Sequence, residues 1–102
     1  MVKGMLLGLL KDRGEAWLDL CDVTERKIDA ERAMSLAHTR VMATWLGEGE
    51  REGARSRMFL DTWEQVEAVD ALRVEGNRAK MKLEHIDARL SAWKAIARMG
   101  GE

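Results

Sequence analysis

The sequence predicts an all-α fold: a long, coiled-coil-like antiparallel two-helix hairpin with a short N-terminal apolar segment, completed by self-association. The 102-residue chain contains no proline. Eight of its nine glycines lie near the two ends or around residues 47–53, so residues 15–46 contain no helix breaker and residues 54–99 contain only Gly76. Sheet folds need turn residues about every 8–12 positions, and the chain has no such spacing.

The first helix is expected over about residues 12–46. Asp12 followed by Glu15 is typical of a helix N-terminus, because acidic side chains accept hydrogen bonds from its free N–H groups. Apolar residues then recur at steps of three and four, with a gap at Lys27, as on an amphipathic helix. These positions are Ala16, Leu20, Val23, Ala30, Ala33, Ala37, Val41 and Trp45.

A turn is expected over about residues 47–55, with Gly47 as a left-handed residue that ends the first helix. The second helix follows over about residues 56–99. Its apolar positions are Phe59, Trp63, Val66, Val69, Leu72, Gly76, Ala79, Leu83, Ile86, Leu90, Trp93 and Ala97. Gly76 beside Ala79 marks either a close approach of two backbones or a weak point that costs about 1 kcal/mol.

The length predicts one domain over residues 1–102, and the charges favour a hairpin within it. Residues 12–31 contain seven acids and three bases, a balance of −4, whereas residues 73–98 contain seven bases and three acids, a balance of +4. Folding the chain back at Glu50 places these two stretches side by side. Opposite charges along two paired helices help to set their register and orientation.

Composition argues against several classes of protein. The net charge of −1 is unlike that of a dedicated nucleic-acid binder, which is usually strongly basic. Cys21 is the only cysteine, so no disulfide can form within the chain, which suits a reducing compartment. The apolar run at residues 5–10 is too short for a secretory signal or a membrane span. The expected location is the cytoplasm of a bacterial or phage-infected host cell, with no membrane partner.

No catalytic or metal-binding pattern is present, so we expect neither an enzyme nor a cofactor or metal. Helical metal sites often use Glu-x-x-His pairs, but Ser35 and Lys82 stand three positions before His38 and His85. Cys21 and His38 are about 25 Å apart along one helix, too far for a nucleophile and its base.

The basic stretch of the second helix is the main candidate binding site. Its candidate nucleic-acid contacts are Arg73, Arg78, Lys80, Lys82 and Arg89. A row of cations along one helix can follow a phosphate backbone with a salt-dependent affinity, and it can also bind an acidic protein partner. The alternative is that these cations pair with the acidic first helix of the same chain.

A second set of candidates serves self-association. Two helices cover only one stripe each, and several apolar residues lie off the stripes, so another copy of the chain is the simplest partner. Tryptophans are frequent at interfaces, and methionines suit an adaptable helix surface. The candidate oligomer or partner contacts are Trp17, Trp63, Trp93, Met58 and Met81.

The pattern over residues 26–99 resembles that of bacteriophage recombination mediators of the UvsY type. The resemblance rests on Ala30-Glu31-Arg32-Ala33, on the turn segment at residues 45–49 and on the closing segment at residues 90–98. It implies an oligomer that binds single-stranded DNA and helps to load a recombinase, with Arg78, Lys80, Lys82 and Arg89 on the DNA.

Trp45-Leu46-Gly47 at the turn also resembles the motif of the Trp-x-Gly hairpin substrates of type VII secretion. Two hypotheses therefore stand. The first is a self-associating, non-enzymatic scaffold or accessory protein that binds single-stranded DNA in phage recombination. The second is a protein–protein interaction module, either an inhibitor of a host system or a secreted hairpin, that does not bind nucleic acid.

Overall fold

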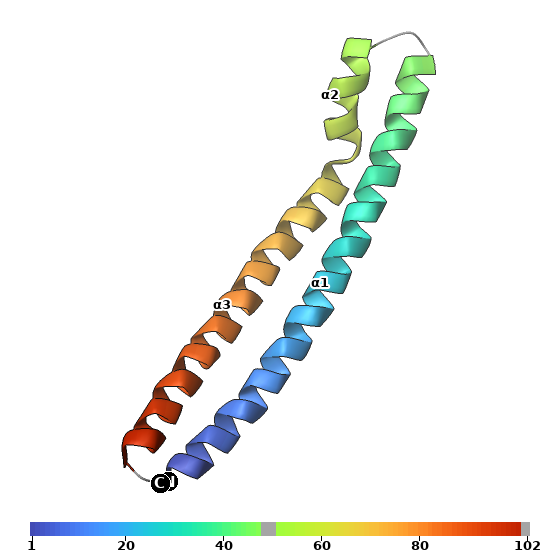
Figure 1. The fold of residues 1–102 in the computed structure, drawn as a ribbon. Coiled ribbons are helices and arrows are strands. Elements are labelled where there is room, and N and C mark those ends of the chain that lie inside the picture. The colour runs from blue at the N-terminus through green and yellow to red at the C-terminus, as the bar shows by residue number, and fades with distance from the viewer. Residues whose placement is uncertain (48–50, 101–102) are drawn as a thin grey trace. The chain divides into compact units, whose positions relative to one another are not determined.

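The computed structural model describes residues 1–47 and 51–100. Within them the chain forms three helices, α1 (Val2–Gly47), α2 (Arg51–Asp61) and α3 (Trp63–Gly100) (Figure 1). The all-α prediction is confirmed, and α1 and α3 are the two long helices of an antiparallel hairpin.

The chain divides into two compact units, each containing part of α1 and part of α3. The first, which we name the terminal unit, comprises Met1–Val23 and Glu75–Glu102. The second, the central unit, comprises Thr24–Val74 and includes α2.

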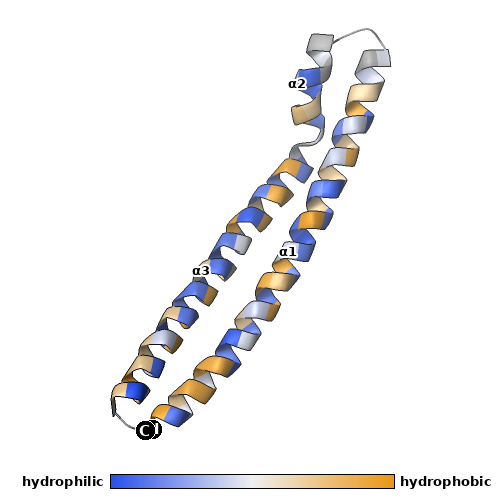
Figure 2. Cartoon of the chain, in the orientation of Figure 1, coloured by the Kyte–Doolittle hydropathy of each residue, from blue (hydrophilic) through white to orange (hydrophobic). Residues whose placement is uncertain are grey.

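The predicted start of the first helix near residue 12 is wrong, because α1 begins at Val2. Leu6 and Leu9 continue the core row of α1 toward the N-terminus, since they precede Arg13 and Ala16 at the same spacing of three and four. Leu9 is buried and Leu6 packs against the core. The apolar N-terminal run at residues 5–10 therefore lies within the first three turns of α1, where Figure 2 shows apolar ribbon.

The predicted turn is also too long. Gly47 is the last residue of α1 and has no left-handed backbone, and α2 begins at Arg51. Residues 48–50 of the predicted turn lie outside the described residues.

The second predicted helix is divided at Thr62 into α2 and α3. The buried Thr62 hydroxyl donates a hydrogen bond to the carbonyl oxygen of Met58, and the backbone N–H of Val66 donates to the carbonyl oxygen of Thr62 at 3.1 Å. A threonine hydroxyl that bonds the carbonyl four residues earlier often bends a helix. The spacing of the apolar residues does not reveal such a side-chain hydrogen bond, so the sequence analysis did not predict the break.

The terminal unit has an apolar core between α1 and α3. Leu9, Ala16, Leu83, Ile86 and Leu90 form one buried cluster. Leu6, Leu20 and Trp93 pack against it. The stripes predicted from spacing are therefore confirmed here, with α1 and α3 antiparallel.

The central unit has a smaller core, and three residues predicted for its apolar stripes lie in solvent. Phe59 and Trp63 are 54% and 56% exposed, and Ala33 is exposed as well. Thr62 and Val69 are buried, and Met34 is half-buried one position after Ala33. Thr62 is buried and Met58 is half-buried, each one position before the residue predicted for that place in the stripe.

Gly76 is not required by a close approach of two helices. A Cβ atom built there would lie 3.6 Å from Cγ1 of Val23, which is ordinary van der Waals contact. Of the two interpretations of this glycine, the structure favours the tolerated weak point.

Candidate interaction surfaces

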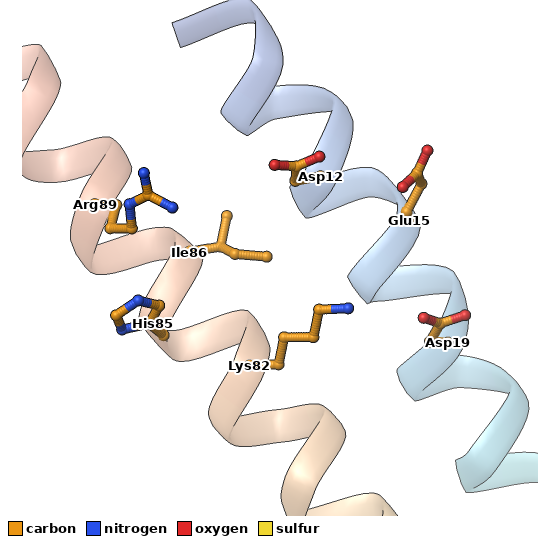
Figure 3. A pocket seen from close by; sticks show the side chains of 7 residues that line it. All are labelled: Asp12, Glu15, Asp19, Lys82, His85, Ile86 and Arg89. Carbon is orange, nitrogen blue, oxygen red and sulfur yellow. The ribbon is translucent and has the colours of Figure 1, made fainter. Parts of the chain in front are cut away.

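The terminal unit contains a groove that brings the acidic start of α1 beside the basic part of α3. The groove is lined by Asp12, Glu15, Asp19, Lys82, His85, Ile86 and Arg89. In Figure 3, Lys82 extends from α3 toward the acidic side chains of α1, and Ile86 points the same way. Three acidic residues of α1 thus line the same groove as two basic residues and a histidine of α3.

The sequence spacing explains why these charges meet. Asp12, Glu15 and Asp19 follow one another at steps of three and four, so they form a row on one flank of α1. Arg78, Lys82 and Arg89 form a corresponding row on α3, which we name the basic row. Within the described structure no hydrogen bond or ion pair joins the three carboxylates to Lys82 or Arg89. Their attraction acts through the groove and is reduced by water and salt.

One direct ion pair between α1 and α3 in the terminal unit joins a base of α1 to an acid of α3, the reverse of the charge balance of the two stretches. Nε of Arg13 donates a hydrogen bond to Oδ1 of Asp87 at 2.6 Å, and both side chains remain more than 40% exposed. Arg13 is thus a base on the acidic stretch, and Asp87 an acid on the basic stretch. The regional charge balance predicted which stretches face one another, but it could not predict this contact.

The five candidate nucleic-acid contacts are all exposed, but they do not form one surface. Arg78, Lys82 and Arg89 share one flank of α3, whereas Lys80 lies two positions from Lys82 and therefore projects from the other flank. Arg73 belongs to the central unit and pairs with Asp70 at 3.1 Å. The basic row is therefore the part of this set that the structure brings together.

The five candidate interface residues also differ in their surroundings. Trp17 and Met81 in the terminal unit and Trp63 in the central unit are at least half exposed. Nε1 of Trp63 donates a hydrogen bond to Oε1 of Glu67 at 2.8 Å. Trp93 packs against the terminal core, and Met58 is half-buried. Trp17, Trp63 and Met81 are thus the three candidates that present apolar surface.

Leu7 and Leu10 were missed as part of the exposed apolar surface of α1, because residues 5–10 were not assigned to the helix. Leu7 and Leu10 are 60% and 50% exposed, and Leu18 is 68% exposed. Extending the helical spacing of α1 back to Val2 would have placed Leu7 and Leu10 on the same side of the helix as Trp17.

The central unit contains a histidine that no sequence pattern singled out as buried. Among the described residues Nε2 of His38 is buried without a hydrogen-bond partner, and the His38 ring meets Phe59 edge to face at 6.1 Å between centroids. Nearby in the same unit, the guanidinium of Arg57 lies 5.4 Å from the ring centroid of Trp45. Neither arrangement contains a reactive pair of side chains.

Within the described residues no group of three or more His, Cys, Asp or Glu side chains is placed to hold a metal ion. The described helices also lack a segment of sufficient length and apolar character to cross a membrane.

Comparisons with protein-family models, with curated proteins and with solved structures find no match to this chain. The chain is therefore described by its fold and its surfaces. It is an all-helical hairpin with exposed apolar side chains and a charged groove. The resemblances to recombination mediators and to Trp-x-Gly hairpins stay predictions.

Proposed function

We propose that this protein is a non-enzymatic helical scaffold that works by self-association. The observation that carries the proposal is the imbalance between exposed and buried apolar side chains. Among the described residues fifteen large apolar side chains are exposed, whereas seven apolar side chains are buried. Small helical chains with so little core gain stability when another surface covers their apolar side chains.

A helical partner suits the kind of surface that is exposed. Leucine, methionine and tryptophan side chains, which pack well between helices, make up most of the exposed apolar set. Aromatic residues and methionine are also enriched at protein interfaces. A second copy of the chain supplies the same residue types and needs no other gene product.

Light scattering on the purified full chain at micromolar concentrations tests the proposal. We expect a mass at least twice the 11.6 kDa of one chain. A mass near 11.6 kDa across the concentration series would overturn the proposal.

A second candidate function, binding of single-stranded DNA in phage recombination, is favoured by the basic row. Arg78, Lys82 and Arg89 are exposed on one flank of α3 at helical spacing. The acidic flank of α1 argues against DNA binding at Lys82 and Arg89. The groove that these two residues line is also lined by three acidic residues, Asp12, Glu15 and Asp19. The candidate therefore rests mainly on Arg78, which does not line that groove, and on salt-dependent attraction to phosphates.

Fluorescence anisotropy with a labelled oligonucleotide at 50 mM salt tests DNA binding. We expect binding that weakens as salt is raised and that is lost in the double variant Arg78→Glu/Lys82→Glu. The control is Lys94→Glu, which changes one exposed cation outside the basic row. Absence of binding by the native protein would leave the protein-interaction module, without nucleic acid, as the remaining hypothesis.

The proposed location is the cytoplasm of a bacterial or phage-infected cell. A single cysteine suits a reducing compartment, and the resemblance to phage recombination mediators implies the same location.

A further inference from the structure

We infer that the exposed apolar face of α1 in the terminal unit binds the same face of a second copy, antiparallel and related by a two-fold axis at Gly14. This inference rests on the proposed self-association and names the surface that performs it. We name this surface the α1 face; its residues are the exposed Leu7, Leu10, Gly14, Trp17 and Leu18 and the half-buried Cys21.

The α1 face is a continuous helical stripe. Leu7, Leu10, Gly14, Trp17 and Cys21 follow one another at steps of three and four, which places them on one side of α1. Leu18 lies beside this stripe and is the most exposed of its large side chains, at 68%. The stripe lies on the opposite flank of α1 from Asp12, Glu15 and Asp19.

Gly14 lies on the α1 face, and the fold of one chain gives this glycine no role. Glycine weakens a helix interior relative to alanine, and Gly14 is in the middle of a continuous helix. A Cβ atom built there would meet no side chain and no other helix within 4 Å. The missing side chain therefore does not accommodate a neighbour within this chain. A glycine on an apolar helix face lets a second backbone approach closely.

The α1 face is complementary to itself about Gly14. In an antiparallel pair with Gly14 on the two-fold axis, each residue lies across from the one equally far on the other side of Gly14. Leu10 is then opposite Leu18 of the second copy, and Leu7 is opposite Cys21. Leu7, Leu10 and Leu18 thus each meet an apolar partner.

The position of Lys11, the charged residue next to the stripe, also fits an antiparallel pair. Lys11 lies opposite Trp17 of the second copy, where its carbon chain can cover the ring and its ammonium can lie over the ring face. The stripe itself contains no charged residue. A parallel pair would instead place each Lys11 beside Lys11 of the second copy, where like charges repel. The self-complementary arrangement is therefore antiparallel.

Cysteine crosslinking of the full chain tests the geometry, because disulfides need Cα atoms within about 7 Å. Under mild oxidation we expect a covalent dimer from Leu7→Cys, which pairs with Cys21 of the other copy. Gly14→Cys in a Cys21→Ser background should also crosslink, across the two-fold axis.

The matched controls should not form a covalent dimer. They are the native protein and Leu7→Cys combined with Cys21→Ser, because the like cysteines would then lie about 21 Å apart. A parallel pair would give the opposite result. Both controls would then form covalent dimers, and Leu7→Cys of one copy would not pair with Cys21 of the other. That result would overturn the inference.

A glycine comparison tests the same surface without cysteine chemistry. Gly14→Leu adds a side chain at the point of closest approach and should weaken self-association at least about tenfold. Gly8→Leu is the control, since Gly8 is equally open but lies on the acidic flank of α1. Unfolding by urea followed by circular dichroism establishes that both variants retain the helical fold. Equal association of the two variants would contradict the inference.

The two proposals fail in different ways. A native mass of one chain in light scattering overturns self-association, and this inference with it. A native oligomer that shows neither the Leu7→Cys crosslink nor the effect of Gly14→Leu overturns the α1 face alone and leaves self-association through another surface.

Discussion

The terminal unit and the central unit use the same two long helices but have unequal cores. Six apolar side chains are buried in the terminal unit, including Leu83, Ile86 and Leu90. In the described part of the central unit, Val69 and Thr62 are the buried residues. Both units show apolar spacing of three and four along α1 and α3, so spacing alone does not account for the difference.

The size of the residues on the apolar stripes explains much of the difference between the two cores. α1 contributes Ala30 and Ala37 to the central unit, and alanine removes little apolar area from water. α3 contributes leucine and isoleucine to the terminal unit, where each buried side chain stabilises the fold by about 1.5–3 kcal/mol. A regular stripe thus predicts which face is buried, whereas the residues on it determine how much that burial stabilises.

The largest expected effect distinguishes the two cores directly. Leu90→Ala should lower the free energy of unfolding by about 2–5 kcal/mol, because a buried leucine leaves a cavity. Val69→Ala removes fewer buried carbons and should cost roughly 2 kcal/mol. Urea unfolding followed by circular dichroism measures both. The control Leu60→Ala changes a side chain that is 67% exposed and should stay within about 0.5 kcal/mol of the native protein. A greater loss from Val69→Ala than from Leu90→Ala would reverse the comparison.

The next prediction concerns a weakness of the central unit. His38→Leu should raise the free energy of unfolding by about 1 kcal/mol, because it removes a buried ring nitrogen that has no hydrogen-bond partner in the described part of the chain. Thermal and urea unfolding measure the change. His85→Leu is the control, since His85 is exposed in the terminal unit and should have little effect. A destabilised His38→Leu variant would indicate that the imidazole makes a needed interaction.

Replacement of Gly76 should give a smaller gain in stability, in this case within the terminal unit. Gly76→Ala should stabilise the protein by about 0.5–1 kcal/mol, because alanine favours the helix and its Cβ would make ordinary contact with Val23. The midpoint of urea unfolding reports the change. Loss of stability would instead show that α1 and α3 need the glycine to approach one another.

The smallest expected effect is that of the Arg13–Asp87 ion pair. A double-mutant cycle of Arg13→Gln and Asp87→Asn should give a coupling of about 0.2–1 kcal/mol, because both groups are largely hydrated. The coupling should fall between 50 mM and 1 M salt as ions screen the charges. A coupling several times larger, unchanged by salt, would place this pair among the main determinants of the terminal unit.

The sequence predicted the fold class and most of the terminal core. Leu83, Ile86 and Leu90 were placed on the buried face by spacing alone, and all three are buried. The start of α1 was misplaced, since Asp12 and Glu15 resemble a helix N-terminus. Both acids instead lie in the interior of α1, beside the groove.

The central unit was harder to predict because a local interaction overrides its spacing. The side-chain bond of Thr62 competes with regular helix, and Thr62 and Met58 take the buried side at this point in place of Trp63 and Phe59. The candidate surfaces were partly predictable for a related reason. Charge balance identified the facing stretches, but whether Arg78 remains available depends on side-chain positions that composition does not contain.

The sequence separation of the terminal contacts has a consequence for the order of folding. Arg13 and Asp87 are 74 positions apart, and every contact between α1 and α3 in this unit encloses residues 24–74. Closing so long a loop costs more chain entropy than closing the shorter loops of the central unit. We therefore expect the unit with the smaller core to form first, since its formation shortens the loop that remains to be closed. Stopped-flow kinetics should then show Val69→Ala mainly slowing folding and Leu90→Ala mainly accelerating unfolding.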